Sequence, residues 1–122
     1  MKSLSKLVNK SKLHRLYSTK ALSGKISLVT GSTSGIGLKV AEMLANNGSD
    51  VMINGFVKES EGKEIAKALN EKTGAKIHFH GADLSKVDQC KDIVHQTSKS
   101  FGRGPDILIN NGEKVLVNRS FF

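Results

Sequence analysis

The chain has 122 residues, which suits a single domain, and its 38% hydrophobic and 25% charged residues are ordinary for a globular protein, which disfavours a disordered chain. Its single cysteine, Cys90, excludes an internal disulfide and a multi-cysteine metal site. The net charge of +8 is uneven, because residues 1–20 hold six basic and no acidic residues, which leaves 13 basic and 11 acidic residues in the remainder. A nearly neutral body disfavours nucleic-acid binding, which needs a basic face on the folded domain.

Residues 1–20 have the composition of a mitochondrial presequence. They are rich in serine and lysine and place Leu4, Leu7 and Val8 on one face of a helix. The run 15–18 resembles the Arg-x-Tyr-Ser processing signal of mitochondrial precursors. We therefore expect delivery to the mitochondrial matrix, and the alternative is a solvated basic tail on a cytoplasmic protein.

Strand and helix patterns alternate from residue 21 onward. Residues 25–30 are a short β-branched run that ends at a glycine, serine and threonine cluster, as a buried strand does on entering a turn. An apolar stripe at helical spacing follows, and Gly48 is expected to end this helix. The stripe consists of Ile36, Val40, Met43 and Leu44. Residues 51–53 are predicted to be a second strand, parallel to the first.

The alternation continues with a helix predicted over residues 59–72. Glu59 and Lys63 are spaced for an ion pair, and Gly74 marks the end of this helix. Residues 77–80 are predicted to be a third strand, in which His78 and His80 share one face. Because no third ligand lies nearby, these histidines are expected to be ordinary strand residues, and no metal site is predicted.

A third helix is predicted to end at Gly102, and Ser85 followed by Asp88 approximates a capping box at its start. Its expected buried face consists of Val87, Cys90, Val94, Thr97 and Phe101. Residues 107–109 form an all-apolar fourth strand. Apolar strands separated by helices indicate a parallel sheet covered on both faces. The predicted fold class is α/β, a doubly wound parallel sheet of the Rossmann type, which is truncated after the fourth strand.

A glycine-rich turn joins the first strand to the first helix. Residues 30–37 read Thr-Gly-Ser-Thr-Ser-Gly-Ile-Gly. Gly31 can take the tight turn, Gly35 lets the backbone approach a pyrophosphate, and Gly37 lets the helix pack closely on the sheet. The free N–H groups and the positive end of the helix dipole would then face phosphates. The alternative is an ordinary turn between a strand and a helix.

This spacing resembles the T-G-x-x-x-G-[IL]-G fingerprint of the short-chain dehydrogenases. Two further marks of that family follow in order, Asp83 after the third strand and Asn110-Asn111 after the fourth. The resemblance covers residues 23–112. Within the family, three runs are most similar to the soluble D-3-hydroxybutyrate dehydrogenases: residues 31–38, 53–56 and 82–85.

The resemblance implies that the chain binds NAD. The implied cofactor-binding residues are Gly31, Thr33, Ser34, Gly35, Ile36, Gly37, Phe56, Ala82, Asp83, Leu84 and Asn111. An acidic residue at the end of the second strand would favour NAD, and an arginine there would favour NADP. The sequence has Asn54, Gly55 and Phe56 at this place, so NADP stays open and NAD follows from the resemblance alone.

The catalytic serine and Tyr-x-x-x-Lys motif of the family have no counterpart in the sequence. The single tyrosine, Tyr17, lies in the leader and has Ala21 in place of the lysine. The resemblance therefore implies the NAD-binding portion of an oxidoreductase whose parent oxidises 3-hydroxybutyrate, with no catalytic residue and no turnover by this chain alone. A nucleotide-binding module without chemistry and an interaction form that pairs with full-length subunits are the alternatives.

The sequence divides into a leader (1–20), a Rossmann half-domain (21–112) and a divergent tail (113–122). Residues 115–117 fit either a fifth strand or an irregular segment. A sheet that stops at the fourth strand would expose an unpaired edge and an apolar patch, so we expect marginal stability or aggregation. No apolar run is long enough to span a membrane. The parent is expected to be a homo-oligomer, whereas the oligomeric state of this chain is left open.

Overall fold

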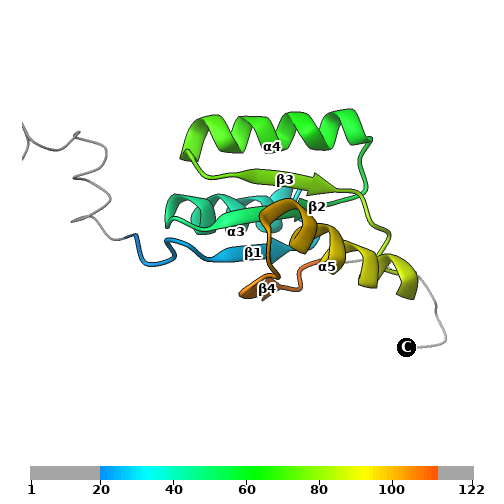
Figure 1. Cartoon of the computed structure of the whole chain (residues 1–122). Helices are drawn as coiled ribbons and strands as arrows, with labels where there is room; N and C mark the ends of the chain where they lie inside the picture. The colour runs from blue at the N-terminus through cyan, green and yellow to red at the C-terminus, as the bar shows by residue number, and fades with distance from the viewer. Residues whose placement is uncertain (1–19, 113–122) are drawn as a thin grey trace, which may run out of the picture.

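The computed structural model describes residues 20–112, which form a four-stranded parallel sheet with helices on both faces (Figure 1). The elements are, in chain order, β1 (Ile26–Val29), α3 (Gly35–Asn46), β2 (Asp50–Asn54), α4 (Glu59–Thr73), β3 (Ile77–His80), α5 (Val87–Phe101) and β4 (Ile107–Ile109). Each predicted strand and helix is thus present. Residues 1–19 of the predicted leader and the whole predicted tail, with its segment 115–117, lie outside the described residues.

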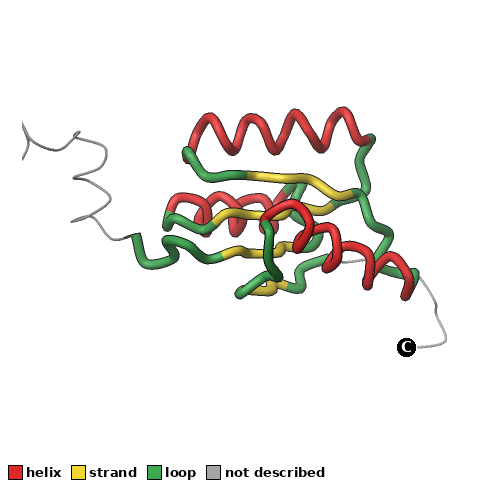
Figure 2. Tube along the Cα trace, in the orientation of Figure 1, coloured by secondary structure: helices red, strands yellow, loops and turns green. Residues whose placement is uncertain are grey.

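The strands lie in the order β3-β2-β1-β4 (Figure 2). The chain moves outward from β1 to β3, and α5 then carries it back so that β4 pairs with the free side of β1. Leu28 of β1 is therefore in register with both Met52 and Leu108. The direction of winding reverses between β1 and β4, and the carboxyl ends of strands at such a reversal are where parallel sheets bind ligands.

Two apolar layers cover the sheet, one on each face. On one face, Val29, Val51 and Ile53 pack with α3 and α4. On the other face, Leu28 and Met52 pack with α5. Successive residues of a strand point to opposite faces, so a strand buried on both faces has no polar alternation. This explains why the central strands are mainly apolar, with Ser27 of β1 as a buried polar exception, and it confirms the doubly wound architecture.

The buried face of α3 differs from the predicted stripe. Val40 and Leu44 do pack against the core, but Ile36 and Met43 are exposed, with 77% and 64% of their surface accessible. The fully buried positions are Gly37, Ala41 and Ala45. Small side chains let a helix lie close to a sheet. The predicted stripe was drawn from large apolar residues and therefore did not include these small ones. The prediction was therefore wrong for Ile36 and Met43.

The predicted buried face of α5 is also partly wrong. Thr97 is buried together with Ile93, whereas Val87 and Val94 are exposed and Cys90 and Phe101 are half-buried. The predicted capping box has Ser85 at the N-cap, whereas the residue at the N-cap of α5 is Lys86, which makes no side-chain capping bond. The Ser85 hydroxyl instead donates to the Asp83 carboxylate at 2.7 Å, a partner only two residues away.

The predicted helix ends and the ion pair are confirmed. Gly74 and Gly102 adopt the left-handed conformation at the ends of α4 and α5, with φ of 75° and 83°. Lys63 Nζ lies 3.2 Å from a Glu59 carboxylate oxygen. No helix within residues 20–112 is both long and apolar enough to cross a bilayer.

Candidate functional site

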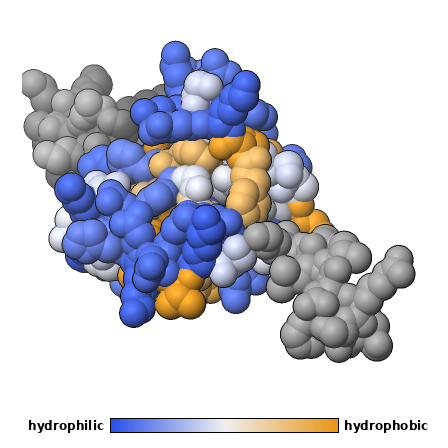
Figure 3. Space-filling model, turned by 90° about the vertical axis from the view of Figure 1, so that its right-hand side faces the viewer, coloured by the Kyte–Doolittle hydropathy of each residue, from blue (hydrophilic) through white to orange (hydrophobic). Residues whose placement is uncertain are grey.

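A cleft of about 810 Å³ opens at the carboxyl ends of the strands. Figure 3 looks at this end of the molecule, where apolar residues form a band beneath the hydrophilic surface of α4. The described residues that line the cleft are Gly31, Thr33, Ser34, Gly35, Ile36, Asn54, Gly55, Phe56, Val57, Leu84, Ser85, Asn111 and Gly112. None of these has a charged side chain, so the cleft offers apolar surface, hydroxyls, amides and backbone groups.

The N-terminus of α3 opens into this cleft through the glycine turn. Gly31 and Gly35 have φ of 59° and 57°, which only glycine adopts freely. Ser34 precedes the helix but makes no capping bond through its side chain, and the first turn of α3 contains no acidic residue. By contrast, the first turns of α4 and α5 contain acidic residues, among them Glu59 and Asp88. Among the described residues, no carboxylate of the first turn or of the cleft lining offsets the positive end of the α3 dipole, which therefore suits an anionic group.

Gly37 brings α3 against the glycine turn. A Cβ at this position would lie 2.1 Å from the Gly31 carbonyl oxygen and 2.6 Å from the Asn111 side-chain nitrogen. That nitrogen donates a hydrogen bond to the same Gly31 oxygen at 3.1 Å. Gly37 was predicted to let the helix pack closely on the sheet, and its close contacts are with the glycine turn that follows β1 and with Asn111 after β4.

Thr30 joins the glycine turn to the end of β4. Its hydroxyl oxygen accepts the N–H groups of Asn111 at 2.9 Å and of Gly112 at 2.8 Å. Two segments about 80 residues apart in the chain thereby form one wall of the cleft. Thr30 is the first residue of the fingerprint, but we predicted no role for it from the sequence, because its partners become neighbours only when β4 pairs with β1.

Asn54 joins the ends of β1, β2 and β3 and is only 3% exposed. Its Nδ2 donates to the carbonyls of His80 at 2.9 Å and Ala82 at 3.0 Å, and its Oδ1 accepts the Gly31 N–H at 3.3 Å. Both amide protons are thus used inside the protein, so this side chain shapes the cleft and has no donor left for a ligand. The signal in the sequence is a polar residue that directly follows a buried apolar run.

Ser32 completes the connection between the glycine turn and β2. It is fully buried, its hydroxyl accepts the Asn54 N–H at 3.0 Å, and its own N–H donates to the Asn54 carbonyl at 2.6 Å. Its hydroxyl donates to the Val29 carbonyl at 2.6 Å. The floor of the cleft is therefore held by buried hydrogen bonds, which resist rearrangement because a broken one leaves an unsatisfied polar group.

The structure brings most of the predicted site residues together. Those that line the cleft are Gly31, Thr33, Ser34, Gly35, Ile36, Phe56, Leu84 and Asn111. Gly37 lies beneath the turn, Ala82 is buried in the core, and Asp83 directs its carboxylate to the backbone and hydroxyl of Ser85. The exposure of Ile36 has its reason here, because this residue faces the cleft and not the core.

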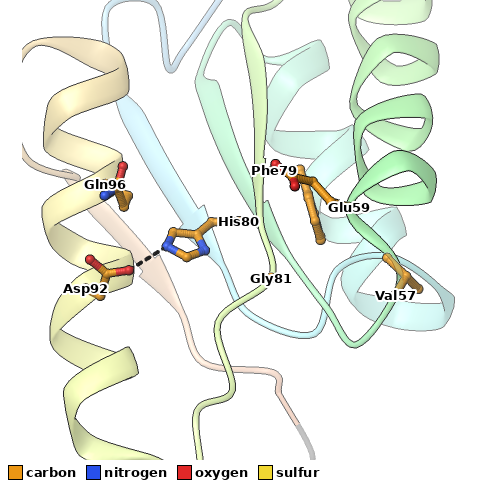
Figure 4. Close-up of a pocket in the computed structure, with 7 residues that line it drawn as sticks. All are labelled: Val57, Glu59, Phe79, His80, Gly81, Asp92 and Gln96. Atoms are coloured by element: carbon orange, nitrogen blue, oxygen red, sulfur yellow. Dashed lines mark hydrogen bonds and ion pairs between the residues drawn. The ribbon is translucent and has the colours of Figure 1, made fainter.

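A second hollow of about 580 Å³ adjoins the cleft at Val57 and lies at the edge of β3 (Figure 4). In it, His80 Nε2 lies 2.8 Å from Asp92 Oδ2, and this hydrogen bond holds the pKa of the Asp92 carboxyl below its usual value. His78 packs its ring edge-on against Phe101 of α5. Both strand histidines thus face α5, and residues 20–112 contain no group of three or more His, Cys, Asp or Glu placed to hold a metal ion.

Comparison with known proteins points to one family. Residues 25–115 match the family model described as short chain dehydrogenase. Two proteins named D-beta-hydroxybutyrate dehydrogenase are similar, one from Cupriavidus necator (46% identity over 74% of this chain) and one from Rhizobium meliloti (36% over 78%). The matches cover 34% and 36% of those proteins, so the chain spans about a third of the length of these relatives.

A solved structure shows the same arrangement of the backbone. The crystal structure of L-sorbose reductase from Gluconobacter frateurii, in complex with NADPH and L-sorbose, matches with a TM-score of 0.72 and 33% identity. The match covers 79% of this chain and 36% of that one.

Proposed function

This chain belongs to the short-chain dehydrogenase family, and on that premise we propose that residues 21–112 bind a nicotinamide dinucleotide as the cofactor-binding portion of an oxidoreductase. The observation that carries the proposal is the N-terminus of α3, which opens into the cleft without a side-chain cap or an acidic first turn. The pyrophosphate would accept hydrogen bonds from the N–H groups at Gly35 and Ile36. The fit is supported by the uncharged side chains of the lining within residues 20–112, since none of them would repel the phosphates.

The two halves of the cofactor would lie on opposite sides of the glycine turn. In sheets of this type the adenosine ribose lies at the end of the second strand. Adenosine would therefore lie near Phe56 and Leu84, which both line the cleft. The nicotinamide half would extend over Asn111, at the end of β4. The bound cofactor supplies hydride transfer between a secondary alcohol and its ketone. The part of this chain would be to bind and orient it.

We infer a preference for NAD over NADP. The 2′-phosphate of NADP needs a basic partner, and no lysine or arginine is among the described residues that line the cleft. Residue 55 is glycine, and a Cβ there would lie 2.1 Å from the Thr33 hydroxyl oxygen. Thr33 therefore fills the space that an arginine for the 2′-phosphate would need at this position. Titration of the chain with NADH and NADPH tests this, and tighter binding of NADPH would contradict it.

A substitution at Ser34 tests the phosphate site. Aspartate is a good N-cap, so Ser34→Asp should leave the fold as stable or more stable, yet its charge would repel the pyrophosphate. We expect saturable NADH binding, seen as a change in NADH fluorescence, for the wild-type chain and for the uncharged control Ser34→Asn, and none for Ser34→Asp. Equal binding by Ser34→Asp and Ser34→Asn would reject the site.

The parent activity that we propose is interconversion of a 3-hydroxy acid, 3-hydroxybutyrate, and its ketone. It is supported by the similarity to the two D-beta-hydroxybutyrate dehydrogenases. The 122 residues hold no Tyr-x-x-x-Lys motif to exchange a proton with the alcohol. We therefore expect the chain to bind NADH but to form none from NAD and D-3-hydroxybutyrate. Turnover by the purified chain would show that other residues perform the proton transfer.

We propose that the basic leader directs the protein to the mitochondrial matrix. The proposal rests on the acid-free composition of residues 1–20 and on the run 15–18. A fluorescent protein fused after the full chain should enter mitochondria, and deletion of residues 2–17 should leave it in the cytoplasm. Mitochondrial delivery that survives the deletion would refute the proposal.

A further inference from the structure

Helix α5 holds the segment that follows β3 through three contacts. The Asp83 N–H donates to Gln89 Oε1 at 2.6 Å. The Cys90 thiol lies 3.1 Å from the Leu84 carbonyl oxygen, to which it donates. The third contact is made by His80, the last residue of β3, whose side chain points toward α5 (Figure 4).

The third contact fixes the end of β3. His80 Nε2 lies 2.8 Å from Asp92 Oδ2, and the imidazole is mostly buried, with 25% of its side chain exposed. On the opposite side, Asn54 donates to the carbonyls of His80 and Ala82. The backbone of residues 80–84 is therefore held between β2 and α5.

The segment that α5 holds reaches the cleft, but the two α5 side chains that hold it do not. Leu84 lines the cleft, whereas Gln89 and Asp92 do not. Because the adenosine half of the cofactor is placed over the ends of β2 and β3, the position of Leu84 decides how well that half is enclosed. The two α5 side chains thus lie one residue shell behind the surface that would contact adenosine.

We propose that Gln89 and Asp92 are positioning residues that set the adenosine side of the cleft by holding residues 80–84 against α5, an inference that rests on the proposed dinucleotide site. They act through the Asp83 backbone and the His80 imidazole and touch no ligand themselves. The mechanism predicts a selective defect, in which binding of adenosine is weakened and binding of the nicotinamide half is unchanged.

Two substitutions in the full chain test the proposal. Gln89→Met keeps the side-chain length but removes the strong acceptor, and Asp92→Ala removes the partner of His80. Each should weaken NADH binding about tenfold, as expected for the loss of one hydrogen bond that fixes a contact surface. Asp92→Asn keeps an acceptor oxygen for the imidazole N–H and should restore most of the affinity.

Reduced nicotinamide mononucleotide, which lacks adenosine, separates positioning from general damage. Its affinity should stay within about twofold in all three variants. Asp88→Asn, which removes a charge from the first turn of the same helix, is the control and should bind NADH like the wild type. Equal losses for NADH and the mononucleotide, or wild-type NADH affinity in Gln89→Met and Asp92→Ala, would overturn the proposal.

Amide hydrogen exchange of the free chain tests the positioning without a ligand. Exchange at residues 82–85 should become faster in Gln89→Met and Asp92→Ala but not in Asp92→Asn, while β1 keeps its protection. Unchanged exchange in this segment would refute the role of α5. If the wild-type chain binds no dinucleotide, the proposed function fails, and the exchange result decides the positioning by itself.

Discussion

The glycine turn has no space for a side chain at Gly37, because a Cβ would overlap the Gly31 carbonyl. We expect Gly37→Ala to lower the free energy of unfolding by about 1–3 kcal/mol, as overpacking does, and to abolish NADH binding by shifting α3 from the turn. Urea unfolding and NADH fluorescence measure the two effects. Gly104→Ala is the control, since its nearest neighbour would lie at an ordinary 3.6 Å. Equal stability of the two variants would contradict the packing argument.

Asn54 presents its amide protons to two backbone carbonyls, so its chemistry matters more than its size. Asn54→Asp replaces that donor by an acceptor of the same shape, and the two carbonyls lose their partner inside the protein. We expect the free energy of unfolding to fall by about 2–4 kcal/mol. Asn47 makes a similar bond to the Met43 carbonyl at the exposed end of α3, so Asn47→Asp should cost less than about 1 kcal/mol. Similar losses in urea unfolding would contradict this account.

At the scale of single elements, β4 is fastened to the sheet by the residue that precedes it. Asp106 accepts the Ile26 N–H at 2.9 Å and forms an ion pair with Arg103 at 2.8 Å. The hydrogen bond from the Arg103 guanidinium holds the pKa of the Asp106 carboxyl below its ordinary value of 3.8, and the bond from the Ile26 N–H lowers this pKa further. The connection between β1 and β4 is thus partly ionic.

This connection predicts a loss of stability in acid. A carboxyl with a lowered pKa in the folded state stabilises the fold above its unfolded pKa, and this contribution is lost as the pH falls through the folded value. Stability should therefore decline from about pH 4 downward. In Asp106→Asn the decline should be shallower, because the variant lacks this titration. Thermal unfolding across pH 2–7 measures the difference, and parallel curves for the two proteins would exclude a contribution from Asp106.

The elements could be predicted from the sequence better than their contacts. The apolar runs and the glycine stops are local signals, so all four strands and all three helices in residues 20–112 were found. The faces of α3 and α5 were partly missed, because Ala41, Ala45 and Ile93 are buried by the position of the helix on the sheet. The glycine turn was found for the same local reason, whereas Thr30 and Asn54 acquire their roles through partners 23 to 82 residues away.

At the scale of the whole molecule, β4 forms an edge of the sheet. Within residues 20–112 it pairs only with β1, and Leu108 is 62% exposed. Its register partner Leu28 packs on the α5 face, so Leu108 faces that side as well. An edge strand with exposed apolar side chains is a site for association between chains.

A charge on this edge should reduce self-association. We expect Leu108→Lys to lower the light scattering of concentrated protein while thermal stability is retained. Met43→Lys is the matched control, because Met43 is similarly exposed at 64% but lies on α3, away from the sheet edge. An equal reduction by both variants would assign the effect to net charge and not to the edge of β4.

The position of β4 beside β1 also has a consequence in time. The ribosome makes β1 first, and β2 can pair with one side of it soon afterward, but its other side stays empty until residues 107–109 have emerged. At about 5–20 residues per second, the nascent chain carries a half-paired first strand for several seconds. Thr30 and the glycine turn acquire their partners in the same late event. The cleft is therefore completed only after residues 107–112 have emerged, and until then one side of β1 lacks its partner strand.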